Sequence, residues 1–154
     1  MLTVTISDQL GNQMFAYASV KTIAQNRGET FGFVRAKNNL INDTDKQYGN
    51  EIHTIFPNTK AEFLTELPTA ITHTWEEPPM GERTANYQPS ALTVPENTLM
   101  KGHFISCQYF WENRSQVQKW FSFPDSSPPA VESEYLLIHY AFPEYRYMHV
   151  QNHS

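Results

Sequence analysis

A glycine followed by two carboxamide residues, Gly11-Asn12-Gln13, stands between a β-like run and a helix-like run near the start of the chain. Gly11 suits a sharp backbone turn, and the side chain of Asn12 can cap a helix or bind a hydroxyl group. The first amides of the following helix then point at whatever lies beyond the end of the strand. Such a loop holds sugars and phosphates well, so the pattern predicts a site for one of these ligands.

Patterns for other chemistry are weak. His149 and His153 stand four residues apart with His139 nearby, but no acidic or cysteine ligand has a diagnostic spacing, so we predict a polar chain end and no metal site. The lone Cys107 excludes an intramolecular disulfide, and its apolar, aromatic surroundings favour a buried, inert thiol. Phosphate-loop, dinucleotide and nucleophile-elbow motifs do not occur in the sequence.

Three elements position the glycine loop. Residues 2–6 predict a strand, a helix follows the loop and ends at Gly28, and residues 30–34 predict a second strand. The apolar positions of the helix recur at helical spacing, at Ala16, Val20, Ile23 and Ala24. A β-α-β order of this kind predicts parallel strands with a right-handed crossover, so we expect an α/β, Rossmann-like domain with a parallel sheet.

The middle of the chain has weaker patterns. Residues 58–67 predict a short helix closed by Pro68, and residues 71–75 alternate as a strand does. Residues 76–96 contain four prolines and a glycine, which predicts a surface loop or an insertion.

Order returns at residues 99–106, which predict a strand leaving through Gly102. Residues 122–134 are linker-like, and residues 135–140 have the composition of a buried parallel strand. With 154 residues, the whole chain 1–154 is expected to be a single Rossmann-like domain.

Aromatic residues cluster after the Gly102 strand. Core packing is the simplest expectation for them, and a sugar-stacking platform is the alternative, which requires an exposed ring beside Gly11. The residues concerned are Tyr109, Phe110, Trp111, Trp120, Phe121 and Phe123.

Composition excludes several classes of function. The formal net charge is -5 and no run of Lys or Arg occurs, so we expect no nucleic-acid partner. No window approaches the roughly 20 apolar residues of a membrane span, and the start of the chain does not resemble a signal peptide. The sequence therefore predicts a cytoplasmic protein without a membrane span.

The glycine loop resembles the amino-terminal motif of the α-1,2-fucosyltransferases of glycosyltransferase family 11, which reads G-G-L-G-N-Q-M-F-Q-Y-A. Residues 10–15 and 17–18 match that motif letter for letter, whereas Asp8, Gln9 and Ala16 differ. A second family segment, L-x-G-Y-F-Q-S-x-x-Y-F, is matched in register at Gly102, Phe104, Ser106, Tyr109 and Phe110. In the family, an amphipathic helix follows, and residues 117–121 supply a comparable apolar face.

The donor motif of the family, H-x-R-R-x-D-Y, is matched only in part. His139 and Tyr145 stand in place and Glu144 replaces the aspartate, but both arginine positions are occupied by Ala141 and Phe142. Neither side chain can pair with a diphosphate as a guanidinium does. Arg146 follows a few residues on, and a rescue by its side chain is not indicated by the spacing.

The resemblance implies the amino-terminal domain of a two-domain, GT-B glycosyltransferase that transfers fucose from GDP-fucose to a galactoside hydroxyl, with inversion and without a metal or other cofactor. It implies that Gly11, Asn12 and Gln13 line the cleft. It also implies that the donor-site remnants bind the nucleotide sugar, and these are His139, Glu144, Tyr145 and Arg146.

The family's second domain begins near this donor motif, and the chain stops at Ser154. We therefore expect a truncated transferase that is weak or inactive alone. The alternative is a non-catalytic saccharide-binding or interaction domain descended from such an enzyme, or a subunit whose cleft is completed by a partner chain.

Overall fold

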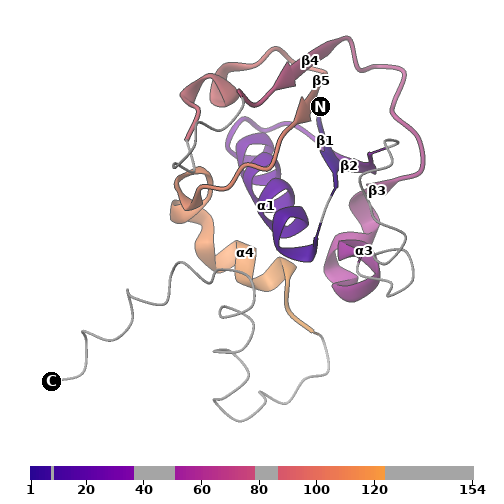
Figure 1. Cartoon of the computed structure of the whole chain (residues 1–154), viewed down its shortest axis with the longest axis vertical. Coiled ribbons are helices and arrows are strands. Elements are labelled where there is room, and N and C mark those ends of the chain that lie inside the picture. Colours follow the sequence, from indigo (N-terminus) through magenta and orange to yellow (C-terminus); the bar gives the residue numbers. More distant parts are fainter. Residues whose placement is uncertain (8, 37–50, 79–86, 124–154) are drawn as a thin grey trace, which may run out of the picture. The chain divides into compact units, whose positions relative to one another are not determined.

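The computed structural model describes residues 1–7, 9–36, 51–78 and 87–123. Met1–Ser122 form one compact unit, and the elements below belong to it (Figure 1). Its five strands make one sheet in the order β3-β2-β1-β5-β4, and all four neighbouring pairs are parallel. The strands are β1 Leu2–Ile6, β2 Phe31–Arg35, β3 Phe63–Leu64, β4 His73–Glu76 and β5 Thr98–Lys101. The expected α/β fold with a parallel, Rossmann-like sheet is confirmed.

The opening β-α-β unit forms as the sequence predicts. Helix α1, Leu10–Asn26, follows β1 and returns the chain to β2, which pairs with β1 over five residues from Leu2↔Phe31 to Ile6↔Arg35. Gly28 ends the helix with a φ of 67°, a conformation that costs glycine little, and Glu29 N–H donates to the carbonyl of Ala24 at 2.9 Å. This ending leaves only four residues between α1 and β2, so the helix packs directly on the sheet.

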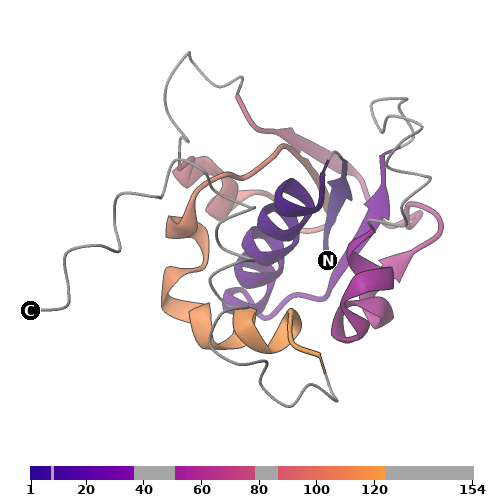
Figure 2. The same ribbon diagram turned by 60° about the horizontal axis from the view of Figure 1, so that its bottom comes forward.

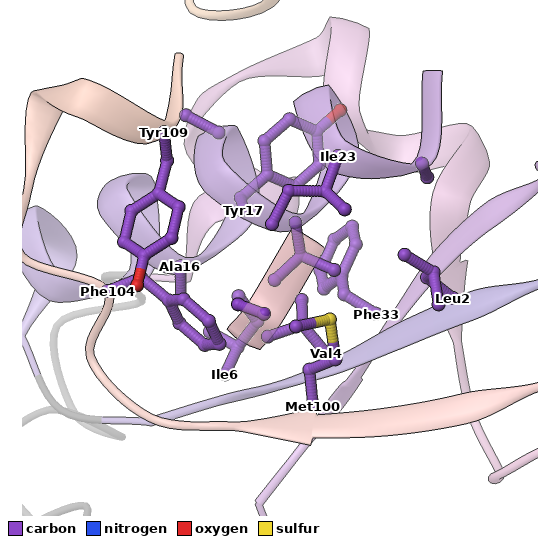
Figure 3. Packing of buried hydrophobic residues seen from close by; sticks show 14 of the residues in the cluster. Leu2, Val4, Ile6, Ala16, Tyr17, Ile23, Phe33, Met100, Phe104 and Tyr109 are labelled. Atoms are coloured by element: carbon purple, nitrogen blue, oxygen red, sulfur yellow. The ribbon is translucent and has the colours of Figure 1, made fainter. Parts of the chain in front are cut away.

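The core lies between the sheet and α1. Side chains on one face of the strands point at the helix (Figure 3), and those of Leu2, Val4 and Met100 have no exposed surface. From the helix, Tyr17 and Val20 are equally buried. Burial of each such side chain contributes roughly 1.5–3 kcal/mol, which makes this layer the main source of stability.

Shorter helical elements lie around α1, and in Figure 2 α4 is below it and α3 is to its lower right. Asn58 ties two of them together because its amide donates to the carbonyl of Lys119 at 2.7 Å. The α-helices are α3 Ile52–Ile55 and α4 Arg114–Trp120, and the 3₁₀ helices are η1 Pro57–Glu62, η2 Pro89–Thr93, η3 Cys107–Tyr109 and η4 Trp111–Asn113. The amphipathic helix expected around residues 117–121 is confirmed as α4, with Trp120 buried.

The prediction of a helix over residues 58–67 is wrong in its second half. The 3₁₀ helix η1 ends at Glu62, and the next two residues form β3. Phe63 pairs with Phe33 of β2, and their rings lie 5.5 Å apart. Pairing with β2 and partial burial of the ring outweigh the local helical pattern, because tertiary contacts override weak propensity.

Two further predictions need adjustment. The strand expected at residues 71–75 is present as β4, two residues later. The strand expected at residues 99–106 ends at Lys101, because Gly102 has a φ of 154° and Phe104 one of 53°, and these angles turn the chain away from the sheet. The expected loop at 76–96 contains η2, and its residues 79–86 lie outside the described residues.

Candidate functional site

A pocket opens at the carboxyl ends of β1 and β2, the edge at which parallel α/β sheets bind ligands. Its space amounts to about 270 Å³, part of it open solvent. The space enclosed by protein atoms amounts to only about 20 Å³, room for about one water molecule, so the pocket is a shallow hollow in the surface. It is lined by Ile6, Gln13, Phe33, Arg35, Glu51, Ile52, His53 and Phe63.

Gly11 and Asn12 do not take the positions expected of them. The helix starts at Leu10 with Gln9 as its N-cap, so Gly11 lies inside the first turn and forms no sharp turn, and Asn12 does not cap. The first helical hydrogen bond runs from Gln13 N–H to the carbonyl of Gln9 at 3.2 Å. Gly11 and Asn12 are both half-buried, and neither of them lines the pocket.

Gln13 connects the motif to the pocket wall. Its side chain is 5 % exposed, and its Oε1 accepts a hydrogen bond from the backbone N–H of Ile52 at 3.1 Å. This bond satisfies one of the free amides at the start of α3 and fixes that helix beside α1. Gln13 therefore shapes the pocket that it lines, and its binding of a ligand stays a prediction.

Three polar side chains in contact with one another line one part of the pocket. Arg35 Nη2 at the end of β2 lies 2.5 Å from Glu51 Oε1, and Glu51 Oε2 lies 3.3 Å from His53 Nε2. Glu51 is the N-cap residue of α3, where its negative charge also interacts favourably with the helix dipole. The arginine is thus neutralised by its neighbour, which suits an uncharged, hydroxyl-rich ligand better than a diphosphate.

His53 is held in one orientation and kept neutral. Its ring stacks on Phe63, with centroids 3.9 Å apart and planes 4° from parallel. Burial lowers the pKa of His53 from its usual value, and the charges of Arg35 and Lys60 lower it further, whereas Glu51 opposes the shift. A neutral imidazole beside a carboxylate can accept a proton from a hydroxyl group, which is general-base chemistry.

The lowered pKa of His53 predicts a pH dependence of folding. The unfolded chain takes up a proton at this histidine near pH 6.5 and the folded chain only at lower pH, so its contribution to stability is present above about pH 6.5 and is lost as the pH falls. We expect wild type to lose more free energy of unfolding than His53→Gln between about pH 7.5 and about pH 5. Urea unfolding at both pH values measures this, and equal losses in the two proteins would contradict it.

The contacts among Arg35, Glu51 and His53 were not predicted from the sequence. Arg35 immediately follows the predicted strand at residues 30–34, and a polar residue at the carboxyl end of a parallel strand is a recognisable signal. Glu51 and His53 carry no such signal, because a long polar connection separates them from β2 and only the tertiary structure brings them back to it.

The remaining predicted site residues cannot be located. Residues 124–154 lie outside the described residues, so the donor-site predictions are untested. They are His139, Glu144, Tyr145 and Arg146.

Core packing, the simplest expectation for the aromatic cluster, holds for four of its six residues, whereas Phe123 is 45 % exposed. Tyr109 and Trp120 are buried, and Phe110 and Phe121 pack partly against the core. Trp111 is 57 % exposed, with the guanidinium of Arg114 5.4 Å from its ring centroid.

The sugar platform given as the alternative stays a prediction, although Trp111 belongs to a 3₁₀ helix that is tied to the far end of α1. Asn113, in the same 3₁₀ helix, hydrogen-bonds Asn26 at 3.2 Å, and Asn26 ends α1 whereas Gly11 begins it. Cys107 is a free thiol and is half-buried, less enclosed than predicted.

No family model, curated protein or solved structure matches the chain. Among the described residues, no helix has the length and apolar character needed to cross a bilayer. In the same residues, no three His, Cys, Asp or Glu side chains gather closely enough to hold a metal ion.

Proposed function

We propose that the chain is a glycosyltransferase-like domain of the family 11 type, related to the enzymes that transfer fucose from GDP-fucose to a galactoside hydroxyl, and that it is weak or inactive alone. One observation carries the proposal. The segment that resembles the family motif forms the start of α1, and its Gln13 lines the pocket at the carboxyl edge of a parallel sheet. Nucleotide-sugar enzymes of this architecture bind their substrates at that edge.

The pocket supplies groups for the acceptor half of such a reaction. Inverting transfer requires a base that removes the proton of the attacking hydroxyl group. In this proposal the acceptor sugar enters beside Phe63, and His53, whose Nε2 lies 3.3 Å from Glu51 Oε2, accepts that proton. Arg35 holds the Glu51 carboxylate in place, which keeps the imidazole oriented.

The donor half is where the proposed activity is weakest. Ala141 and Phe142 stand at the two positions where the family has arginines, and neither can pair with a diphosphate. Nucleotide binding should therefore return when these arginines are restored. This expectation separates a decayed donor site from a protein that never bound nucleotides.

Calorimetric titration with GDP and GDP-fucose tests the proposal on the full chain. We expect wild type to bind in the millimolar range or not at all, and the double variant Ala141→Arg/Phe142→Arg to bind at least about tenfold more tightly, since two bidentate contacts are gained. The double variant Gln116→Arg/Gln118→Arg is the matched control, because it adds the same charge at exposed positions of α4. An equal gain in both variants would show unspecific attraction and overturn the transferase ancestry.

The second candidate is a non-catalytic saccharide-binding domain. The neutralised Arg35–Glu51 pair and the stacked His53–Phe63 rings favour it, because together they offer hydroxyl partners and an apolar ring without net charge. Galactoside binding that Glu51→Gln weakens, combined with no GDP binding in the arginine-restored variant, would favour this candidate over the transferase.

A further inference from the structure

The loop after β5 is closed by a carboxylate. Glu77, the residue after β4, accepts hydrogen bonds at Oε2 from the backbone N–H groups of His103 at 2.8 Å and Phe104 at 3.0 Å. Its own N–H donates to the carbonyl of Lys101 at 2.8 Å. β4 and β5 are paired neighbours (Figure 1), so this contact joins the ends of two adjacent strands.

The backbone of the loop is shaped around that carboxylate. Phe104 has a φ of 53°, an unfavourable conformation for a bulky residue, and its ring is completely buried. A Cβ atom on Gly102 would lie 2.5 Å from Cβ of Glu77 and 2.7 Å from its Oε2. Two successive amides that converge on one oxygen form the kind of backbone concavity that binds anions in proteins.

The position of the loop also favours a ligand. In the order β3-β2-β1-β5-β4, the chain passes from β1 to one side of the sheet and later fills the other side through β4 and β5. The boundary between β1 and β5 is therefore a topological switch point, where open α/β sheets bind ligands beyond the carboxyl ends of their strands. The loop at residues 102–104 directly follows the carboxyl end of β5.

We propose that the amides of His103 and Phe104 form a binding site for the phosphate group of a ligand, and that Glu77 occupies this site when no ligand is bound. An incoming phosphate oxygen replaces the carboxylate oxygen on the same two amides, so the number of hydrogen bonds to the loop is conserved. Glu77 is only partly buried, so its carboxylate can turn into solvent when it is displaced.

An internal carboxylate competes strongly with a free anion. Its effective concentration at the amides is in the millimolar range or higher, as for any tethered ligand. The site therefore has low apparent affinity for phosphate in wild type, and removal of the Glu77 carboxylate should expose its intrinsic affinity. This site does not depend on the proposed transferase function.

Titration of the full chain with inorganic phosphate, followed by ¹H–¹⁵N chemical shifts, tests the proposal. We expect Glu77→Ala to bind phosphate at least about tenfold more tightly than wild type, with the largest shifts at the His103 and Phe104 amides. Glu76→Ala is the matched control. It removes the same charge one residue earlier, where Glu76 pairs with the exposed Lys101 Nζ at 3.1 Å, and it should behave as wild type.

A second anion and a second variant complete the experiment. Acetate should shift the same amides less than phosphate does, and equal shifts would overturn the preference for phosphate. If Glu77→Ala does not fold, Glu77→Gln retains an oxygen acceptor without the charge and should bind phosphate more tightly than wild type. A folded Glu77 variant whose His103 and Phe104 amides do not respond to phosphate would overturn the proposal.

Discussion

Replacing Glu62 by alanine is expected to destabilise the domain by about 3 kcal/mol, because it leaves the buried charge of Lys21 without a negatively charged partner. Lys21 Nζ lies 2.5 Å from Glu62 Oε1, and the lysine side chain is 8 % exposed. The lysine also donates to the hydroxyl of Tyr17 at 2.7 Å, and that hydroxyl donates to Glu62 Oε2 at 2.6 Å. Burial and the neighbouring carboxylate raise the pKa of Tyr17, so the phenol remains a donor at any working pH.

The control for this prediction removes both charges. The double variant Lys21→Met/Glu62→Leu replaces the pair by apolar groups and is expected to be more stable than Glu62→Ala alone. Urea unfolding of wild type and the two variants gives the free energies. A loss of less than about 1 kcal/mol in Glu62→Ala would show that the pair behaves as a solvated surface bridge and would contradict the prediction.

Gly102→Ala should produce the second large loss, about 2–4 kcal/mol. The new methyl group would meet the Cβ of Glu77 at 2.5 Å, at a φ of 154° that side chains rarely adopt. Because Cβ of Glu77 is close to the backbone, the clash cannot be relieved by rotating a flexible tip. Thermal or urea unfolding measures the loss of stability.

Gly28→Ala is the matched control for this substitution. Gly28 also has a positive φ, 67°, but no atom lies within 4 Å of the added Cβ. Its cost should be limited to backbone strain, about 1 kcal/mol. If the two variants lose the same stability, the loop around Glu77 yields freely, and the tight contact contributes nothing.

Local patterns were sufficient for the opening unit of the fold. The strand at Leu2–Ile6 has the predicted bounds, the helix ends before Gly28 as predicted, and the second strand is shifted by one residue. Each of these elements has a strong period, and a glycine marks the end of the helix. A short element such as β3 was missed, because its two residues form a strand only by pairing with β2.

The candidate site divides in the same way. The motif around Gln13 was recognised from sequence, and its place at the carboxyl end of β1 follows from the β-α-β order. The sequence did not reveal the positions that Gly11 and Asn12 take, because the helix begins at Leu10 and not after Asn12. The contact between Arg35 and Glu51 could not be predicted from the sequence either.

By itself, then, the sequence determined the fold class, the parallel opening unit and the edge of the sheet at which a site should lie, because these depend on periodicities within a few residues of one another. Only the tertiary structure decided which side chains meet there. Arg35, Glu51 and His53 come together because Gln13 of α1 holds α3 in place, and the start of α3 then lies at the end of β2. Glu77 reaches the amides after β5 because two distant segments are paired strands. Contacts between segments far apart in the chain leave no local pattern in the sequence.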